Sequence, residues 1–425
     1  MLAISKHSRI VVGYRSAIAY NFQSERAFKF DKALARHLLN LLPSVKADLI
    51  TAVLKIRLVA PPENSAIEGL LDDLLNLGIL ESCGPATTQA SHSEFPTPLL
   101  RTLVLEINTR CNFNCQHCYL GDSLKSGEQL DLDVIRKLLD DASSLKIDRV
   151  QLTGGNPALH PDVIGSLDLL RDYPYEVFFF SNGTGLSTPL LQALKAANAA
   201  VHVSVYGMSN NSGQAFTRYE SYFDTLNRTL QSLEDYDIRL RSLDYMVVDE
   251  NQGEIDNFIA MCKAHGYHYR FGSVVQVGNA VRNKVKNHRE TTSLLEPFLE
   301  NEAAPRFRRM SCYVDQPVVL ASGNVTFCLA ANEHFDDFIL GNIHESSLGS
   351  IWMGARTVNI RNSVGVDSLP VCGNCEFKYL CGGVCPFSRK FREVGVRADG
   401  TPDCGTYDNN SWFSDSEESP ELLMP

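Results

Sequence analysis

The stretch Cys111-Asn-Phe-Asn-Cys115-Gln-His-Cys118 constrains this chain most, because it spaces three cysteines as C-x3-C-x2-C. It follows the apolar run 103–107, whose length and composition are typical of a buried strand. Three thiolates can bind three irons of a cubane [4Fe–4S] cluster and leave the fourth iron open to a substrate. A structural zinc ion instead takes four ligands, usually as two C-x2-C pairs. We therefore expect Cys111, Cys115 and Cys118 to ligate an iron–sulfur cluster.

This spacing resembles the C-x3-C-x-φ-C motif of radical S-adenosylmethionine (radical SAM) enzymes, in which φ is an aromatic residue and is His117 here. The resemblance implies that the open iron binds the amino and carboxylate groups of S-adenosylmethionine. An electron from the cluster then yields a 5′-deoxyadenosyl radical, which abstracts hydrogen from a substrate. It also implies an external electron donor, such as flavodoxin or ferredoxin. We expect His117 and Tyr119 to pack beside the adenine.

The totals bound the function. A length of 425 residues predicts two or three domains, and the twelve cysteines, with no secretory signal expected, indicate metal or redox use in the cytoplasm. The sequence contains no run of ~18 apolar residues, so we expect no membrane-spanning segment. The net charge of −11 argues against a general nucleic-acid binder. Residues 1–60 nevertheless hold ten Lys/Arg against three Asp/Glu, which suits an acidic partner or is simply a solvated basic face.

Residues 1–82 predict a small sheet followed by three helices. Strands are expected at 9–12, 17–22 and 27–30, and apolar stripes predict helices around 34–42, 49–56 and 67–74. This order resembles the winged-helix peptide-recognition element of ribosomal peptide-modifying enzymes, which is related to the chaperone of pyrroloquinoline quinone biosynthesis. The resemblance implies that the leader of a precursor peptide adds a strand to the sheet edge. DNA binding is the alternative, but the acidic third helix would repel phosphates.

Residues 83–100 predict a linker, and residues 101–300 predict a barrel. The expected strands are 103–107, 149–153, 176–181, 200–206, 240–248 and 268–275. The expected helices are 131–145, 161–172, 187–197, 221–234 and 254–265. This alternation predicts an α/β fold with a parallel sheet and outer helices. The radical SAM resemblance implies a partial (β/α)6 TIM-like barrel, with the active site at the carboxyl ends of the strands.

Three motifs fall at these strand ends. Gly154, Gly155 and Asn156 occupy the place of a Gly-Gly-Glu segment that binds the ammonium of the cofactor in the family, and Asn156 keeps an acceptor oxygen without the charge. Asn182, in Ser-Asn-Gly-Thr, and Ser204, before Val-Tyr-Gly, resemble further cofactor contacts, with Ser204 at the ribose. The candidates for the cofactor carboxylate remain open among Arg218, Arg241 and Arg270.

A second cysteine array lies within residues 305–405 and resembles the SPASM extension, which binds two auxiliary clusters. It comprises Cys312, Cys328, Cys372, Cys375, Cys381, Cys385 and Cys404. A zinc ribbon is the alternative for the C-x2-C pair alone. The resemblance implies one cluster on Cys372, Cys375, Cys381 and Cys404. It assigns Cys312, Cys328 and Cys385 to the other, and Arg306 stands where many members have a further cysteine.

Residues 406–425 predict an acidic tail without order, and contact with the basic N-terminal region in cis is the alternative. Together, the resemblances indicate a maturase that binds a precursor peptide through its leader and forms a carbon–carbon or thioether cross-link. Three alternatives stay open. They are a sulfatase-maturase-like oxidation of Cys or Ser, an enzyme acting on a small molecule, and a redox-sensing winged-helix regulator.

Overall fold

The computed structural model describes twelve segments of the chain: residues 2–5, 8–24, 26–30, 32–33, 35–36, 72–82, 101–285, 316–331, 336–383, 395–398, 400–403 and 421–423. The linker 83–100 and most of the first two predicted helices lie outside these residues, as do Cys312, Cys385, Cys404 and Arg306. Within the described residues, no helix is long and apolar enough to cross a membrane.

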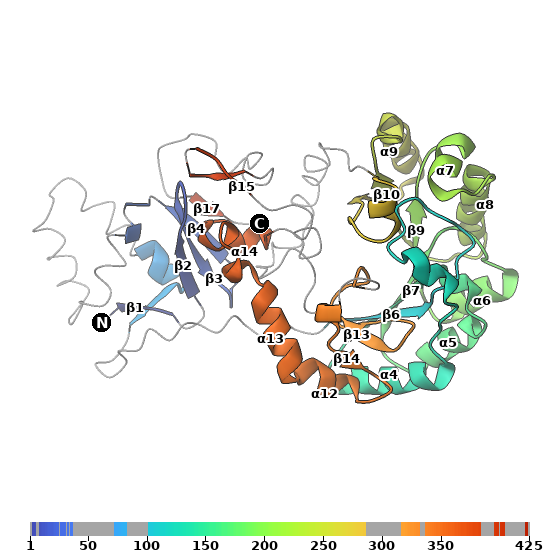
Figure 1. Ribbon diagram of the computed structural model, residues 1–425, viewed down its shortest axis with the longest axis horizontal. Coiled ribbons are helices and arrows are strands. Elements are labelled where there is room, and N and C mark those ends of the chain that lie inside the picture. Colours follow the sequence, from blue (N-terminus) through green and yellow to red (C-terminus); the bar gives the residue numbers. More distant parts are fainter. Residues whose placement is uncertain are drawn as a thin grey trace, which may run out of the picture.

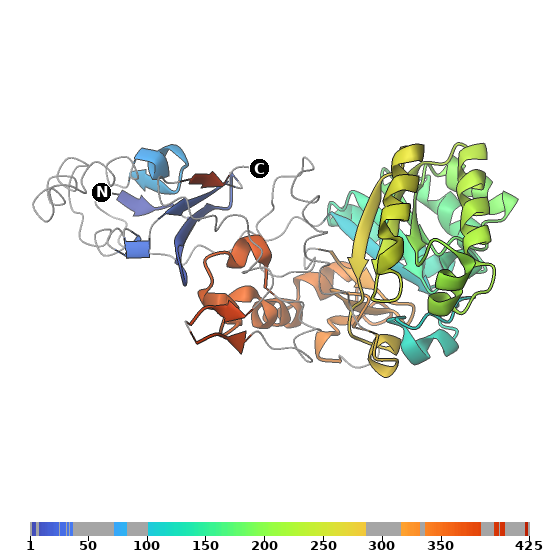
Figure 2. The same ribbon diagram turned by 90° about the horizontal axis from the view of Figure 1, so that it is seen from above.

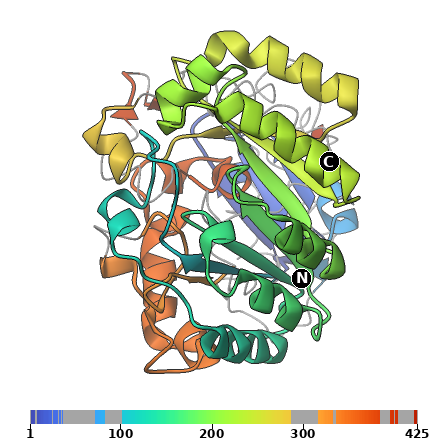
Figure 3. The same ribbon diagram turned by 90° about the vertical axis from the view of Figure 1, so that its right-hand side faces the viewer.

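A parallel sheet forms the large domain (Figure 1). Its strands follow one another in chain order from β6 to β11, which confirms the α/β partial barrel. They are β6 (Thr102–Asn108), β7 (Arg149–Gly154), β8 (Glu176–Ser181), β9 (Ala200–Val205), β10 (Leu240–Val247) and β11 (Tyr269–Ser273). Figure 3 shows helices lying along the outer face of this sheet. They are α4 (Leu132–Ser144), α5 (Val163–Leu170), α6 (Thr188–Ala196), α7 (Asn210–Thr217), α8 (Tyr222–Asp235) and α9 (Ile255–His265).

Alternation along the strands separates the two faces of the sheet. In β6, Leu103, Leu105 and Ile107 belong to the core that packs under the helices, whereas Glu106 belongs to the inner face. Helix α7 was not predicted, because its sequence Asn-Asn-Ser-Gly-Gln lacks an apolar repeat. A capping box between Ser209 and Ser212 starts it instead.

The SPASM-like segment begins by extending the barrel sheet. Strand β12 (Val318–Val319) runs parallel to β6, and β13 (Asn324–Thr326) and β14 (Gly341–Asn342) follow it antiparallel. Helices α12 (Leu348–Met353) and α13 (Ala355–Val364) then lead from the barrel toward the N-terminal sheet (Figure 1). The sequence placed this segment in a separate domain, but its first hairpin continues the sheet of the barrel.

The N-terminal sheet is antiparallel and contains β2 (Ser8–Val12), β3 (Ala17–Asn21) and β4 (Arg26–Phe30). A short ladder between β1 (Leu2–Ile4) and β5 (Leu80–Ser82) lies beside it. Residues 72–76 are helical and end before Gly78, whose φ of 63° is one that glycine adopts readily. Residues 421–423, predicted as part of an unordered tail, form β17 (Glu421–Leu423) and pair with β4.

The N-terminal sheet packs on the far end of the SPASM-like segment (Figure 2). That end contains the short helices η7 (Val366–Ser368), η8 (Cys372–Asn374) and α14 (Lys378–Cys381). One apolar cluster joins Ile18 and Tyr20 of β3 to Val366, Phe377 and Tyr379. A sheet at the N-terminus is therefore held against cysteine-bearing helices more than 300 residues further along the chain.

Candidate functional site

The loop that carries Cys111, Cys115 and Cys118 leaves the carboxyl end of β6 and is held by two distant elements. The backbone N–H of Gln116 donates to Phe216 O at the end of α7 over 3.0 Å. Asn279, the first residue of α10 (Asn279–Arg282), donates its backbone N–H to Cys118 O over 2.9 Å and its side-chain N–H to Cys115 O over 3.2 Å. These bonds fix the loop at the mouth of the barrel.

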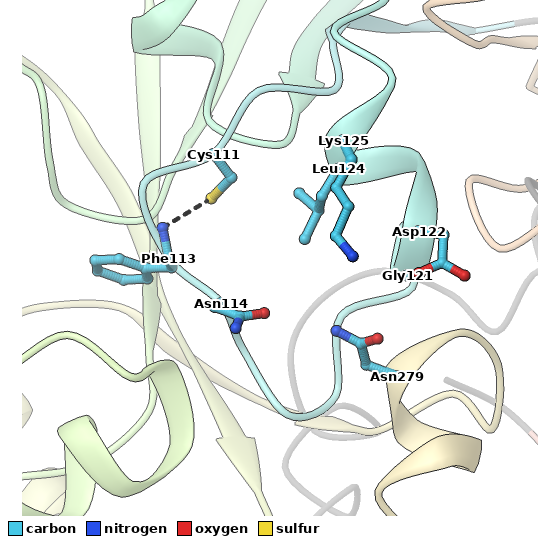
Figure 4. A pocket seen from close by; sticks show the side chains of 8 residues that line it. All are labelled: Cys111, Phe113, Asn114, Gly121, Asp122, Leu124, Lys125 and Asn279. Carbon is cyan, nitrogen blue, oxygen red and sulfur yellow. Dashed lines mark hydrogen bonds between the residues drawn. The ribbon is translucent and has the colours of Figure 1, made fainter.

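A cavity of about 290 Å³ opens beside this loop (Figure 4). Leu124 and Lys125 project into it from the short helix η2 (Gly121–Lys125), and Cys111 lies on the opposite side. The Cys111 thiol accepts hydrogen bonds from the backbone N–H of Phe113 at 3.4 Å and from Asn182 Nδ2 at 3.6 Å. Two N–H donors of this kind stabilise an electron-rich sulfur, such as that of a thiolate.

The donor set fits an iron–sulfur cluster. Burial raises the pKa of Cys111 and Cys115, and it raises the pKa of Cys118 to about 12. A thiolate at these positions therefore needs positive charge nearby, which bound iron supplies. Among the described residues, no group of three His, Cys, Asp or Glu is arranged around a single ion.

An amide hub joins the three loops at the barrel mouth. Asn112 Oδ1 accepts from Asn156 Nδ2 at 3.1 Å, from Asn182 Nδ2 at 3.2 Å and from Thr184 Oγ1 at 2.9 Å. The Asn156 oxygen accepts from the backbone N–H of Ala158 at 3.2 Å, and its side chain is fully buried. Asn156 therefore braces the cysteine loop. Sequence reasoning missed Asn112 and Thr184, although an Asn directly after Cys111 was a usable signal.

The two glycines of this segment allow backbones to meet. A Cβ on Gly154, whose φ is 149°, would lie 2.2 Å from Asn108 O. A Cβ on Gly155 would lie 2.4 Å from Arg110 O. The backbone N–H of Gly155 donates to Asn108 O over 2.9 Å. The end of β7 is thus bound to the segment that immediately precedes Cys111.

The side chains of His117 and Tyr119 lie in different environments: His117 contacts an aromatic ring, and Tyr119 contacts a buried carboxyl group. The His117 ring stacks on Phe216 at 4.6 Å, and burial lowers its pKa to about 4, so it is neutral. Tyr119 donates its hydroxyl to Glu106 over 3.0 Å, and the other Glu106 oxygen accepts from the backbone N–H of Ala321 at 3.2 Å. Burial raises the pKa of Glu106 to about 7.

Tyr119 also connects the cysteine loop to the surroundings of Cys328, one of the predicted auxiliary cysteines. Tyr119 and Cys328 pack against the same apolar cluster of Val277, Ala330 and Ala331. Glu106 anchors the hairpin between β12 and β13, which precedes Cys328. The structure therefore brings the neighbourhoods of Cys118 and Cys328 together around one tyrosine.

A charged network lines the inner face of the sheet. Arg270 Nε donates to Asp244 Oδ1 over 2.8 Å, and Arg270 NH2 lies 3.1 Å from His202 Nδ1. Although burial opposes it, hydrogen bonds from His202 and Arg270 lower the pKa of Asp244 to about 2. Ser204 is in register with Asp244. Of the three candidate arginines, Arg270 belongs to this inner face, whereas Arg218 and Arg241 are exposed.

A second cysteine site lies at the contact with the N-terminal sheet. Cys372 and Cys375 pack against the cluster that contains Tyr20, and Cys381 ends α14. The adjacent Glu376 is fully buried. Its carboxylate accepts from the backbone N–H groups of Tyr14, Arg15 and Ser16 at 2.9, 2.9 and 3.0 Å.

Comparison with known proteins finds family matches for two regions of the chain. Residues 105–262 match the radical SAM superfamily, and residues 312–376 match SPASM, an iron–sulfur cluster-binding domain. The chain thus contains a radical SAM region and a SPASM region. These regions imply [4Fe–4S] clusters and S-adenosylmethionine as cofactors.

Two curated relatives show how far the likeness extends. The Bacillus subtilis protein AlbA, of subtilosin bacteriocin biosynthesis, is 24% identical over 332 residues, which cover 73% of this chain and 72% of AlbA. A probable GTP 3′,8-cyclase of Thermoplasma volcanium is 26% identical over 162 residues, 38% of this chain. The matched part spans about half (49%) of the length of that cyclase.

A solved structure extends the likeness to nearly the whole chain. Streptococcus suis SuiB bound to its precursor peptide SuiA superposes with a TM-score of 0.56 at 14% identity, over 94% of this chain and 98% of SuiB. The aligned residues therefore extend over nearly the whole of both chains.

Proposed function

We propose that this chain modifies a ribosomally made precursor peptide by hydrogen-atom abstraction, and that it forms a carbon–carbon or thioether cross-link in that peptide. The peptide leader binds the N-terminal sheet, and the core peptide enters the barrel mouth. AlbA acts in bacteriocin biosynthesis and SuiB was solved with a precursor peptide, and both likenesses support this assignment.

One observation carries the proposal: a sheet with an edge that accepts an added strand is fastened to the cysteine-bearing end of the SPASM region. The fastening combines an apolar cluster around Tyr20 with the buried carboxylate of Glu376. An extended peptide bound at such an edge gains main-chain hydrogen bonds without regard to most of its side chains. A fixed docking geometry then delivers the following residues toward the clusters.

The chain's own residues prepare the reaction site. When bound, the cluster and S-adenosylmethionine supply hydrogen-atom abstraction. Asn112, Asn156 and Asn182 hold the cysteine loop to the neighbouring strand ends. On the inner face, Asp244 orients the Arg270 guanidinium, which then presents a cation to the carboxylate of the cofactor or of the peptide.

Glu106 does not belong to the network of Asp244 and Arg270; it lies between Tyr119 and Ala321. It holds the Tyr119 hydroxyl and the hairpin before Cys328 together, so that Cys328, a proposed ligand of an auxiliary cluster, lies near the cysteine loop. An electron donor such as flavodoxin or ferredoxin in the cytoplasm is the reductant that we propose. Cys111, Cys115 and Cys118 hold the cofactor-binding cluster, and the SPASM cysteines hold the auxiliary clusters.

The test uses a candidate precursor peptide, sought among short open reading frames near the gene and incubated anaerobically with the reconstituted enzyme and a reductant. We expect 5′-deoxyadenosine and a peptide that has lost two hydrogens for each cross-link, located by tandem mass spectrometry. In the Gly13→Ala variant, the new Cβ would lie 2.0 Å from Glu376 Oε2 and displace the sheet. Cofactor cleavage should persist while peptide modification falls at least about tenfold, as for other losses of substrate positioning.

Gly253→Ala is the matched control, because its Cβ would meet nothing within 4 Å. It should retain both activities. Unchanged modification by Gly13→Ala, or equal turnover of a leaderless peptide, would favour a sulfatase-maturase-like oxidation. Tight binding of duplex DNA without cofactor cleavage would favour a redox-sensing regulator.

A further inference from the structure

The edge of the N-terminal sheet is paired with the chain's own residues 421–423. Strand β17 lies antiparallel to β4, with Glu421 opposite Lys29, Leu422 opposite Phe28 and Leu423 opposite Ala27. The sheet order is β17-β4-β3-β2, so β17 forms the outermost strand beside β4 (Figure 1). In this pairing, the main-chain groups along the outer edge of β4 face another backbone.

The register gives the edge a chemical preference. Residues directly opposite in an antiparallel pair share a face of the sheet, so an acidic residue is placed across from Lys29. Phe28 and Ala27 are buried, and they belong to the two apolar clusters on opposite faces of the sheet. The segment that pairs here thus places an acidic position opposite Lys29 and two apolar positions opposite Phe28 and Ala27.

Charge favours the same pairing over a longer range. Residues 405–425 contain five Asp/Glu and no Lys or Arg, whereas residues 1–60 carry ten Lys/Arg against three Asp/Glu. Opposite net charges attract over about 8–10 Å at ordinary ionic strength. A segment of this composition is therefore drawn to the N-terminal region before any strand pairing occurs.

We propose that residues 421–423 occupy the β4 edge as an internal competitor for the peptide leader, and that the leader taken by this edge likewise places an acidic residue before two apolar ones. The competition rests on the function proposed above. One edge pairs with one added strand, so leader and competitor exclude each other. Within one chain, the competitor has an effective concentration of about millimolar, which weakens leader binding without abolishing it.

The first test needs no precursor peptide. A fluorescent peptide of residues 411–425 is titrated into the reconstituted full-length chain and into a chain truncated after Asn410. The truncated chain should bind it at least about tenfold more tightly, because the internal competitor is gone. Backbone amides of residues 26–30 should lose protection from hydrogen exchange on truncation and regain it with the added peptide. Equal affinity for both chains, or unchanged protection, would overturn the proposal.

A charge exchange tests the register. Lys29→Glu in the truncated chain should weaken binding of the peptide, and a Glu421→Lys peptide should recover it on that variant while binding the unmodified truncated chain poorly. If each substitution alone weakened peptide binding, and the Glu421→Lys peptide did not bind the Lys29→Glu chain better, Glu421 and Lys29 would not lie opposite each other. A peptide with Glu417→Lys changes the net charge by the same two units as Glu421→Lys, so it separates pairing from general attraction.

The precursor peptide separates the two hypotheses. Truncation after Asn410 should lower the precursor concentration needed for half-maximal modification by at least about tenfold. If the truncated chain binds peptide 411–425 at residues 26–30 but modifies no precursor, the proposed function fails while the edge pairing stands. If precursor is modified equally with and without residues 411–425, the competition is wrong and the proposed function stands.

Discussion

The two cysteine sites of the described chain are built in opposite ways. The loop of Cys111, Cys115 and Cys118 donates hydrogen bonds to carbonyl groups of α7 and accepts them from α10 and from the amide hub, and it lies at a cavity. Cys372 and Cys375 instead pack into an apolar cluster shared with the N-terminal sheet. A site that must admit a cofactor is fixed from its sides, whereas a site inside a domain contact also fixes the domain. A substitution in the loop of Cys111, Cys115 and Cys118 should abolish cofactor cleavage. A substitution at the contact around Cys372 and Cys375 should release the N-terminal sheet.

The largest effect is expected from Cys115→Ala. It should abolish 5′-deoxyadenosine formation and remove about four of roughly twelve irons in the reconstituted protein. Docking of the N-terminal sheet should be unchanged, because Cys115 lies outside that contact. Iron analysis and product chromatography measure both results.

Cys262→Ala is the control, since Cys262 is a buried cysteine of α9 outside either array. It should keep its iron and its cofactor cleavage. Cleavage of S-adenosylmethionine by the Cys115→Ala variant would contradict the assignment of a cofactor-binding cluster to Cys115. Stoichiometric zinc in place of the auxiliary iron would contradict the assignment of clusters to the SPASM cysteines.

Glu376→Gln should release the N-terminal sheet while sparing cofactor cleavage. The carboxylate accepts three backbone N–H groups, and a glutamine would turn donor hydrogens toward some of them. Leaving such buried groups unsatisfied costs about 1–3 kcal/mol. Hydrogen exchange of residues 14–20 should accelerate by one to two orders of magnitude, about the factor that this energy corresponds to.

The exposed Glu345→Gln change is the matched control and should leave exchange at residues 14–20 unaltered. Faster exchange in the cysteine loop rather than in the sheet would contradict the separation. It would show that Glu376 stabilises the whole SPASM region instead of one contact.

The sequence predicted the barrel well because each strand carries its own apolar pattern, and all six barrel strands lie where that pattern placed them. The assignment of Cys111, Cys115 and Cys118 to a cluster stays a prediction, and it could be made from the sequence because cluster chemistry requires a fixed spacing. The role of Asn112 could not be predicted, because it depends on Asn156 and Thr184 arriving from other strands. Glu376 was equally hidden, since its partners lie about 360 residues earlier in the chain.

The smallest predicted effect concerns the inner face of the barrel, and it tests whether that face is independent of both cysteine sites. Asp244 has a pKa of about 2, below its ordinary value of 3.8, because His202 and Arg270 hydrogen-bond to its ionised form. Its stabilising contribution is therefore fully present above pH 3.8 and is lost as pH falls toward 2.

Asp244→Asn should cost about 2 kcal/mol at pH 7, the equivalent of that shift. In urea denaturation of the apo chain, the difference between the two proteins should stay constant from pH 7 to about pH 5 and shrink below pH 4. Asp237→Asn replaces an exposed aspartate and should leave the stability almost unchanged at every pH. If the cost of Asp244→Asn varied between pH 5 and pH 7, a group titrating in that range would be coupled to Asp244, and the two candidates are His202, which lies beside it, and Glu106. Loss of that variation in a Glu106→Gln background would show that the inner face is not independent of the contact around Tyr119, whereas its persistence would assign it to His202.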